Sequence, residues 1–150
     1  MVYLGLGSNL GDKKKNIEKA LMLISERVGD VLALSGFYNT HPWGYDSSEL
    51  YINAVAKVCT DLTPEELLNV TQQIEKDVGR TAKTLNGVYN DRIIDIDILL
   101  YDNIIIQTPT LTIPHPLLHQ REFVMTPLSE IAPDILHPVF GKTIAKLICC

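Results

Sequence analysis

The sequence is poor in cysteine, has no long apolar run and carries no excess of basic residues. Its three cysteines are Cys59, Cys149 and Cys150, a spacing that fits neither a disulfide framework nor a zinc site, so we expect free thiols. No run of about 18 apolar residues and no signal-like start occur, so we expect a cytoplasmic protein without a membrane partner. The net charge of -5 argues against a nucleic-acid partner, because such proteins need a basic excess.

What the sequence does contain is the apolar content and periodicity of one folded domain. With 150 residues, 46% of them hydrophobic, we expect a single domain over residues 1–150. The patterns predict strands over 2–7, 30–38, 50–59 and 91–102, a helix capped by Asp12, and a helix over 63–79 that begins at a Thr63/Glu66 capping box and ends at Gly79. A short partner strand over 103–107 and short helices over 127–131 and 142–148 complete the prediction.

The order strand, helix, strand, strand, helix, strand is that of a ferredoxin-like α+β fold. In this fold two helices cover one face of a mostly antiparallel sheet. The other face is then available to ligands, to loops or to the C-terminal segment.

Two aspartates interrupt the apolar strand "DRIIDIDILLYD". Strand alternation places Asp95 and Asp97 on one face, and on the opposite, core-forming face it places Ile94, Ile96, Ile98 and Leu100. Hard oxygen ligands on one strand face suit Mg²⁺, and two such ions are a recurrent device in phosphate chemistry. The alternative is a pair of surface acids on an edge strand.

Several other polar and aromatic residues are candidates for ligand binding because of the residues next to them in the sequence. Tyr51 and Asn53 share a strand face, which suits a flat hydrogen-bonding heterocycle or a simply packed tyrosine, and Trp43 could line a pocket or pin its loop. The "GLGSNLG" stretch lacks the lysine of a phosphate loop and favours a tight strand-to-helix turn. Four cations flank the aspartate strand and together suggest an anion clamp: Arg80, Lys83, Arg92 and Arg121.

His115 and His119 have the four-residue spacing of some zinc sites. Pro114 and Pro116 disfavour a helix through His115, so the spacing does not indicate metal binding. Phosphate contact is the better use for this segment.

Taken in order, these residues resemble the hydroxymethyl-dihydropterin pyrophosphokinase family. The resemblance runs through "GLGSNLGD", "FYNTHPWG", "YINAV", "IEKDVGR", "DRIIDIDILLYD" and "IPHPLLHQREFVMTPLSEIAP". It implies a ferredoxin-like α+β domain that transfers the terminal pyrophosphate of ATP to the hydroxymethyl group of a pterin and releases AMP, in folate biosynthesis. It also implies two Mg²⁺ ions, brought together with ATP, as cofactors.

The resemblance assigns roles by position. Asp95 and Asp97 would be the metal ligands and, with Arg80 and Arg92, the catalytic residues. The pterin side would comprise Thr40, Pro42, Trp43, Gly44, Tyr51, Asn53 and Phe123. The ATP side would comprise Gln72, Glu75, Arg80, Lys83, Tyr89, Arg92, Ile98, Thr112, His115 and Arg121.

The chain departs from the family pattern in one polar segment, residues 80–91. Many members have Trp-Gly-Pro before the arginine that precedes the aspartate strand, where this chain has "YND", and a second arginine where it has "TAK". We expect Tyr89 and Lys83 to stand in for those residues and the segment to close over ATP as a lid.

The same residues are compatible with two other function classes. A two-metal phosphohydrolase or nuclease would use the same aspartate pair but would more often need further metal ligands. A non-catalytic ligand-sensing domain would explain a pocket but not both a metal pair and several cations. A monomer is the favoured oligomeric state.

Overall fold

The computed structural model describes residues 1–40, 51–81 and 93–148. Its strands and helices, in chain order, are β1 (Val2–Ser8), α1 (Lys13–Arg27), β2 (Gly29–Leu34), β3 (Tyr38–Thr40), β4 (Tyr51–Thr60), α2 (Pro64–Thr81), β5 (Asp95–Tyr101), β6 (Ile106–Gln107), β7 (Thr112–Ile113), the 3-10 helix η1 (Leu118–Gln120), α3 (Glu122–Ile131) and α4 (Ile144–Ile148). Within these segments no helix is long and apolar enough to cross a membrane.

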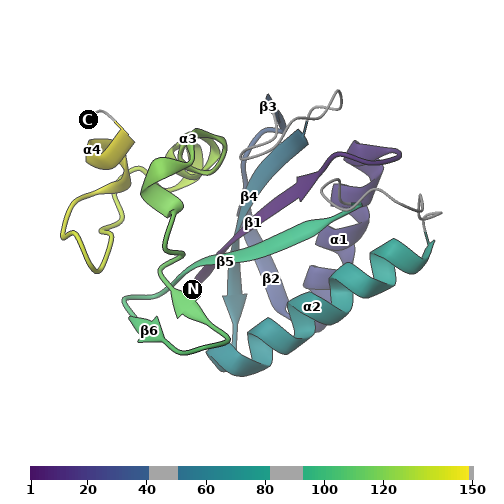
Figure 1. The fold of residues 1–150 in the computed structure, drawn as a ribbon, viewed down its shortest axis with the longest axis horizontal. Coiled ribbons are helices and arrows are strands. Elements are labelled where there is room, and N and C mark those ends of the chain that lie inside the picture. Colours follow the sequence, from purple (N-terminus) through teal and green to yellow (C-terminus); the bar gives the residue numbers. More distant parts are fainter. Residues whose placement is uncertain (41–50, 82–92, 149–150) are drawn as a thin grey trace.

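The main sheet is antiparallel and has helices on both faces. Its strand order is β2-β4-β1-β5, and β3 adds to one end of β4. Helices α1 and α2 lie on one side of the sheet, and α3 and α4 lie on the other (Figure 1). The prediction of two helices on one face of an antiparallel sheet is confirmed, and the C-terminal segment occupies part of the opposite face.

Two apolar clusters fill the spaces on either side of the sheet. The larger one joins the sheet to α1 and α2 through residues such as Leu4, Ile17, Ala56, Ile74 and Ile96. The smaller one joins the sheet to α3 and α4 through Tyr3, Val55, Leu99, Leu128 and Ile144. Because β4 contributes Ala56 to the first cluster and Val55 to the second, both faces of the central strands are largely removed from water.

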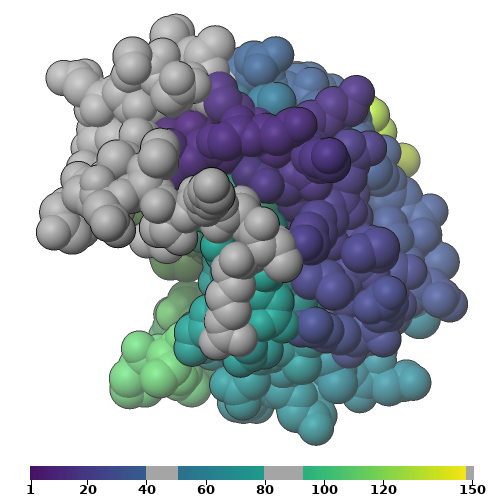
Figure 2. Space-filling model, turned by 90° about the vertical axis from the view of Figure 1, so that its right-hand side faces the viewer, coloured from purple at the N-terminus to yellow at the C-terminus, as the bar shows by residue number. Residues whose placement is uncertain are grey.

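The two long helices begin where the sequence predicts. Asp12 caps α1 by accepting a hydrogen bond from the Lys15 amide at 3.2 Å. At α2 the Thr63 amide donates to Glu66 Oε1 at 2.9 Å, and the Glu66 amide donates to Thr63 Oγ1 at 3.2 Å, which confirms the capping box. The surfaces of the two helices adjoin in Figure 2, where α1 is purple to indigo and α2 is teal.

Three boundary predictions are wrong for identifiable reasons. Helix α2 does not end at Gly79 but continues to Thr81, because Gly79 lacks the positive φ that a terminating glycine uses and that Gly11 shows at 68°. The segment over 103–107 supplies only β6, which pairs with β7 and not with β5. The strand predicted over 30–38 is divided into β2 and β3, separated by Ser35 to Phe37.

The face assigned to Leu100 is also wrong. Ile94, Ile96 and Ile98 pack in the cluster under α1 and α2, as predicted, but Leu100 packs in the cluster under α3 and α4. The register between β1 and β5 shifts at this point, since Tyr3 pairs with Leu100 and Leu4 pairs with Ile98. One extra residue in β5 forms a bulge there, which reverses the alternation beyond it.

Candidate functional site

The candidate site lies on the sheet face that α3 and the C-terminal segment cover only in part. Asp95 pairs with Gly7 and Asp97 pairs with Gly5, both on the central strand β1. The two carboxylates are half-buried, and they lie on the face opposite to the buried side chains of Ile96 and Ile98. The prediction that the two acids share one strand face is therefore confirmed.

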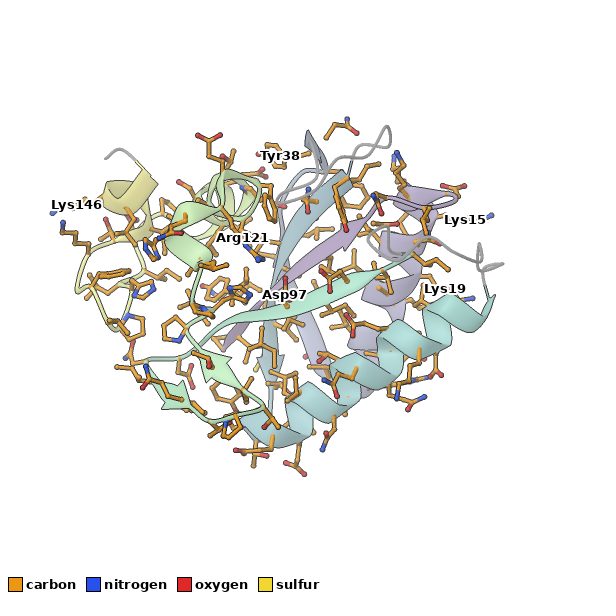
Figure 3. The ribbon with its side chains drawn as sticks, viewed as in Figure 1. Lys15, Lys19, Tyr38, Asp97, Arg121 and Lys146 are labelled. Atoms are coloured by element: carbon orange, nitrogen blue, oxygen red, sulfur yellow. The ribbon has the colours of Figure 1, made fainter. Side chains whose placement is uncertain are left out.

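Arg121 brings a cation to this pair of acids. Its Nη1 atom lies 3.9 Å from Asp97 Oδ2, and its guanidinium carbon lies 5.5 Å from the centre of the Phe123 ring. Asp97 and Arg121 face one another near the centre of Figure 3. Since the guanidinium contacts both an acid of β5 and an aromatic ring of α3, it connects the predicted phosphate side to the predicted pterin side.

Glu75 lies beside the two aspartates and contacts the backbone between them. The Ile96 amide, between the two aspartates, donates to Glu75 Oε2 at 2.8 Å, and the Glu75 carboxyl also hydrogen-bonds to Asp95. Burial, opposed by the Ile96 hydrogen bond and reinforced by Asp95 and Asp97, raises the pKa of Glu75 to about 7. The side chain therefore attaches α2 to the outer edge of β5, next to the two aspartates.

The chemistry of these donors suits a hard cation. Within residues 1–40, 51–81 and 93–148 no group of three or more His, Cys, Asp or Glu side chains is arranged to hold a metal ion. Asp95 and Asp97 by themselves offer two carboxylates on one face, which matches the way Mg²⁺ is held by one or two carboxylates together with phosphate oxygens and water. The residues present thus fit a magnesium ion that arrives with a phosphate ligand.

His115 lies outside any helix, in the turn that follows β7. Burial lowers the pKa of its imidazole, Arg121 lowers it further, and Asp95 opposes both effects. The Leu117 amide donates to His115 Nδ1 at 3.3 Å, so the neutral ring carries its proton on Nε2. The non-helical backbone confirms that the spacing to His119 is not that of a helical metal site.

The predicted pterin residues of β4 lie over Gly7 of β1, which has no side chain. A β-carbon added at Gly7 would lie 3.0 Å from Asn53 Oδ1 and 3.4 Å from Tyr51 Cδ1, so both side chains lie over this glycine. This confirms that Tyr51 and Asn53 share a face. Sequence reasoning placed Gly7 in the first strand and the turn at "SNLGD", which contains Gly11, but it gave Gly7 no role beside Tyr51 and Asn53.

The remaining predicted residues divide into three groups. Gln72 is exposed on α2 and Thr112 is half-buried on β7. Ile98 directs its side chain into the core, so only its backbone, on edge strand β5, is available to a nucleotide. Outside the described residues lie Pro42, Trp43, Gly44, Lys83, Tyr89 and Arg92, the greater part of the predicted lid, and the side chains of Thr40 and Arg80.

Comparison with known proteins identifies one family. The model of the 7,8-dihydro-6-hydroxymethylpterin-pyrophosphokinase (HPPK) family matches residues 3–133. The 2-amino-4-hydroxy-6-hydroxymethyldihydropteridine pyrophosphokinase of Porphyromonas gingivalis is 50% identical over 139 residues, which cover 92% of this chain and 94% of that protein. The enzyme of the same name from Aquifex aeolicus is 41% identical over 145 residues, which cover 97% and 88%.

Solved structures give the same fold at lower sequence identity. A crystal structure of HPPK-DHPS in complex with substrates matches with a TM-score of 0.76 and 17% identity, over 99% of this chain and 42% of the other. A Plasmodium falciparum HPPK-DHPS triple mutant matches with a TM-score of 0.81 and 17% identity, over 99% and 42%. The chain thus spans about two-fifths of these longer proteins, and the likeness concerns the fold.

Proposed function

Because the chain belongs to the 7,8-dihydro-6-hydroxymethylpterin-pyrophosphokinase family, we propose that the sheet face described above carries the family's reaction in this protein. The chain transfers a pyrophosphoryl group to hydroxymethyldihydropterin in folate biosynthesis, and its substrates are ATP and the pterin. Our proposal concerns the residues that perform the transfer, the metal ions and the release of AMP.

The observation that carries this proposal is a row of three residues across the sheet. Asn53 of β4 pairs with Gly7 of β1, which in turn pairs with Asp95 of β5. Adjacent strands lie about 4.8 Å apart, so the predicted pterin residue and the predicted metal ligand are about 10 Å apart with a bare glycine between them. This spacing leaves room for the pterin hydroxymethyl group and the transferred phosphates to meet above Gly7.

Asp95 and Asp97 would hold the two magnesium ions. When bound with ATP, these ions neutralise phosphate charge and orient the triphosphate. The carboxylates are half-buried and in contact with Glu75 and Arg121, which restricts their orientations before any ligand arrives.

The other residues of the site bind and position the substrates. Tyr51 and Phe123 would stack on the pterin ring while Asn53 supplies a donor and an acceptor. Arg121 and the Nε2–H of neutral His115 would contact phosphate oxygens, aided by Arg80 and Arg92. Catalysis is then mostly positioning and charge stabilisation, with the pterin hydroxyl aimed in line at the β-phosphorus.

The element order and the sheet order support a finer reading of the fold. We interpret βαββαβ with strand order β2-β4-β1-β5 as ferredoxin-like, with β3 as an addition. A cytoplasmic protein with free thiols remains our proposal, supported by the low cysteine content and by Cys59, which is a free thiol. We also propose a monomer.

The reaction can be tested by following the phosphorus-containing products by NMR. Purified protein with ATP and Mg²⁺ should release AMP only when hydroxymethyl-dihydropterin is added, together with a new pterin diphosphate. ADP formation, or release of phosphate without pterin, would overturn the proposal and favour a phosphohydrolase.

The metal assignment has its own test in Asp97→Ala. Loss of one of the two carboxylates should lower turnover by about two to three orders of magnitude, while the circular dichroism melting curve stays close to that of the native chain. Asp134→Ala removes an exposed acid elsewhere and should keep full activity. If the Asp97→Ala protein turned over at a near-native rate, Asp97 could not be a metal ligand.

A further inference from the structure

A carboxylate outside the site described above connects two of the elements that build it. Glu130, on the last turn of α3, accepts the Gly36 amide hydrogen at 3.1 Å with each of its two oxygens. The Tyr38 hydroxyl also donates to Glu130 Oε1. One side chain of α3 therefore binds the backbone before β3 and a side chain of β3, and Tyr38 is labelled near β3 at the top of Figure 3.

The segment that Glu130 binds is fixed from its other side by β4. The Ser35 amide donates to the Val55 carbonyl at 2.9 Å, and the Val55 amide donates to Ser35 Oγ at 2.9 Å. Val55 also packs in the apolar cluster that contains Leu128 of α3. The entry to β3 is thus held between β4 and α3.

The β3–β4 pair and helix α3 both carry residues that we assign to pterin binding. On the strand side, Tyr38 pairs with Asn53 and Thr40 pairs with Tyr51. On the helix side, Phe123 lies in the first turn of α3. The binding of a flat ring between aromatic side chains from a strand and a helix depends on the separation of these two elements, and a misplacement of about 1 Å can have a large effect.

We propose that Glu130 is a positioning residue for the pterin, which sets the separation of α3 from the β3–β4 pair through Gly36 and Tyr38. This inference rests on the proposed function, because it takes Tyr51, Asn53 and Phe123 as the pterin contacts. Glu130 itself does not touch the substrate. Its bonds are exposed to water, so the apolar clusters keep the fold when they are lost.

The test compares Glu130→Gln with Tyr38→Phe. In Glu130→Gln one carboxylate oxygen becomes an amide NH2 group, which donates and cannot accept the Gly36 N–H. Tyr38→Phe removes only the hydrogen bond of the hydroxyl. Each should raise the KM and the Kd for the pterin by about threefold to tenfold, the range expected for one lost hydrogen bond, while the KM for ATP is unchanged. The double variant should show less than the product of the two effects, because both changes act on one contact.

Glu26→Gln on α1 is the matched control, since Glu26 is exposed and lies on the helix layer behind the sheet. It should leave both KM values at the native level. An unchanged pterin KM in both test variants would overturn the inference, and so would an equal rise in the KM values of both substrates together with a lower melting temperature, which indicates a general structural role.

The wild-type assay separates this inference from the proposed function. If the native chain forms no pterin diphosphate, the proposed function fails and the inference fails with it. If the native chain is active and the variants bind pterin normally by titration of the ligand's fluorescence, only the role of Glu130 is rejected.

Discussion

At the scale of single residues, Gly7 shows how a missing side chain can shape a binding site. Any β-carbon at this position would lie 3.0 Å from Asn53 Oδ1, closer than is normal for such a contact. We expect Gly7→Ala to displace the Asn53 amide by a few tenths of an ångström and to raise the KM for the pterin by roughly threefold to tenfold. Steady-state kinetics with each substrate varied in turn would measure this change, and the KM for ATP should stay constant.

Gly79→Ala is the control for that substitution. Among the described residues, and apart from its chain neighbours and its own helix backbone, no atom lies within 4 Å of a β-carbon added at Gly79, which is inside α2. Alanine should stabilise the helix by about 0.5–1 kcal/mol and leave both KM values unaltered. If Gly7→Ala and Gly79→Ala gave the same kinetics, the close approach of Asn53 to Gly7 would have no role in pterin binding.

The sequence could predict that Asp95 and Asp97 share a face of their strand, but it could not predict contacts between distant elements. Asp95 and Asp97 follow directly from strand alternation. Glu75 contacts the Ile96 amide across 21 residues of separation, and that contact depends on how α2 packs against the edge of β5. A helical glutamate carries no local signal that distinguishes such a contact from an exposed position.

At the scale of elements, the start of α2 offers a quantitative test of local sequence signals. Thr63 and Glu66 exchange hydrogen bonds between side chain and backbone at the first turn. Thr63→Ala should lower the free energy of unfolding by about 1 kcal/mol, because the Glu66 amide loses its acceptor. Urea denaturation would measure the loss.

Thr126→Ala, in the exposed part of α3, is the comparison for the capping variant. Alanine has the higher helix propensity, so no loss of stability is expected there. Equal unfolding free energies for Thr63→Ala and the native protein would show that water replaces the cap at no cost.

Element predictions succeeded where the signal was local and failed where the tertiary register decided. The capping box and the alternation in β4 involve neighbouring residues, and both are confirmed. Leu100 changed face because a bulge in β5 is set by its pairing with β1. The segment over 103–107 forms β6, which pairs with β7, and apolar content alone does not specify this pairing.

At the scale of the whole molecule, the C-terminal segment packs against part of the second face of the sheet. The proline-rich sequence after residue 110 lacks a regular period, so only short helices could be predicted there. In the structure it supplies Leu118, Val124, Leu128 and Ile144 to the second apolar cluster. Its loop over 137–140, together with the β6–β7 hairpin, also borders a cavity of about 220 Å³.

His137 holds this C-terminal loop together from a buried position. Its Nδ1 atom accepts hydrogen bonds from the amides of Val139 at 3.2 Å and Phe140 at 3.4 Å, and its ring packs against that of Phe140 at 4.6 Å. Burial lowers the pKa of His137 from its ordinary value of 6.5, and His119 lowers it further. Protonation of Nδ1 would remove the acceptor for both amides.

A lowered pKa in the folded state determines how stability depends on pH. Below the ordinary pKa of 6.5 the unfolded chain binds more protons at His137 than the folded chain does, so this residue's contribution is complete above that pH and is lost as the pH falls through the lowered pKa. His137→Asn keeps an acceptor for the two amides but cannot titrate. We expect the variant to be less stable than the native protein at pH 8, because of its smaller side chain, and to lose less stability between pH 7 and pH 5. Urea unfolding at several pH values would compare the two slopes, with His119 present in both proteins, and parallel slopes would show that His137 does not drive the acid sensitivity.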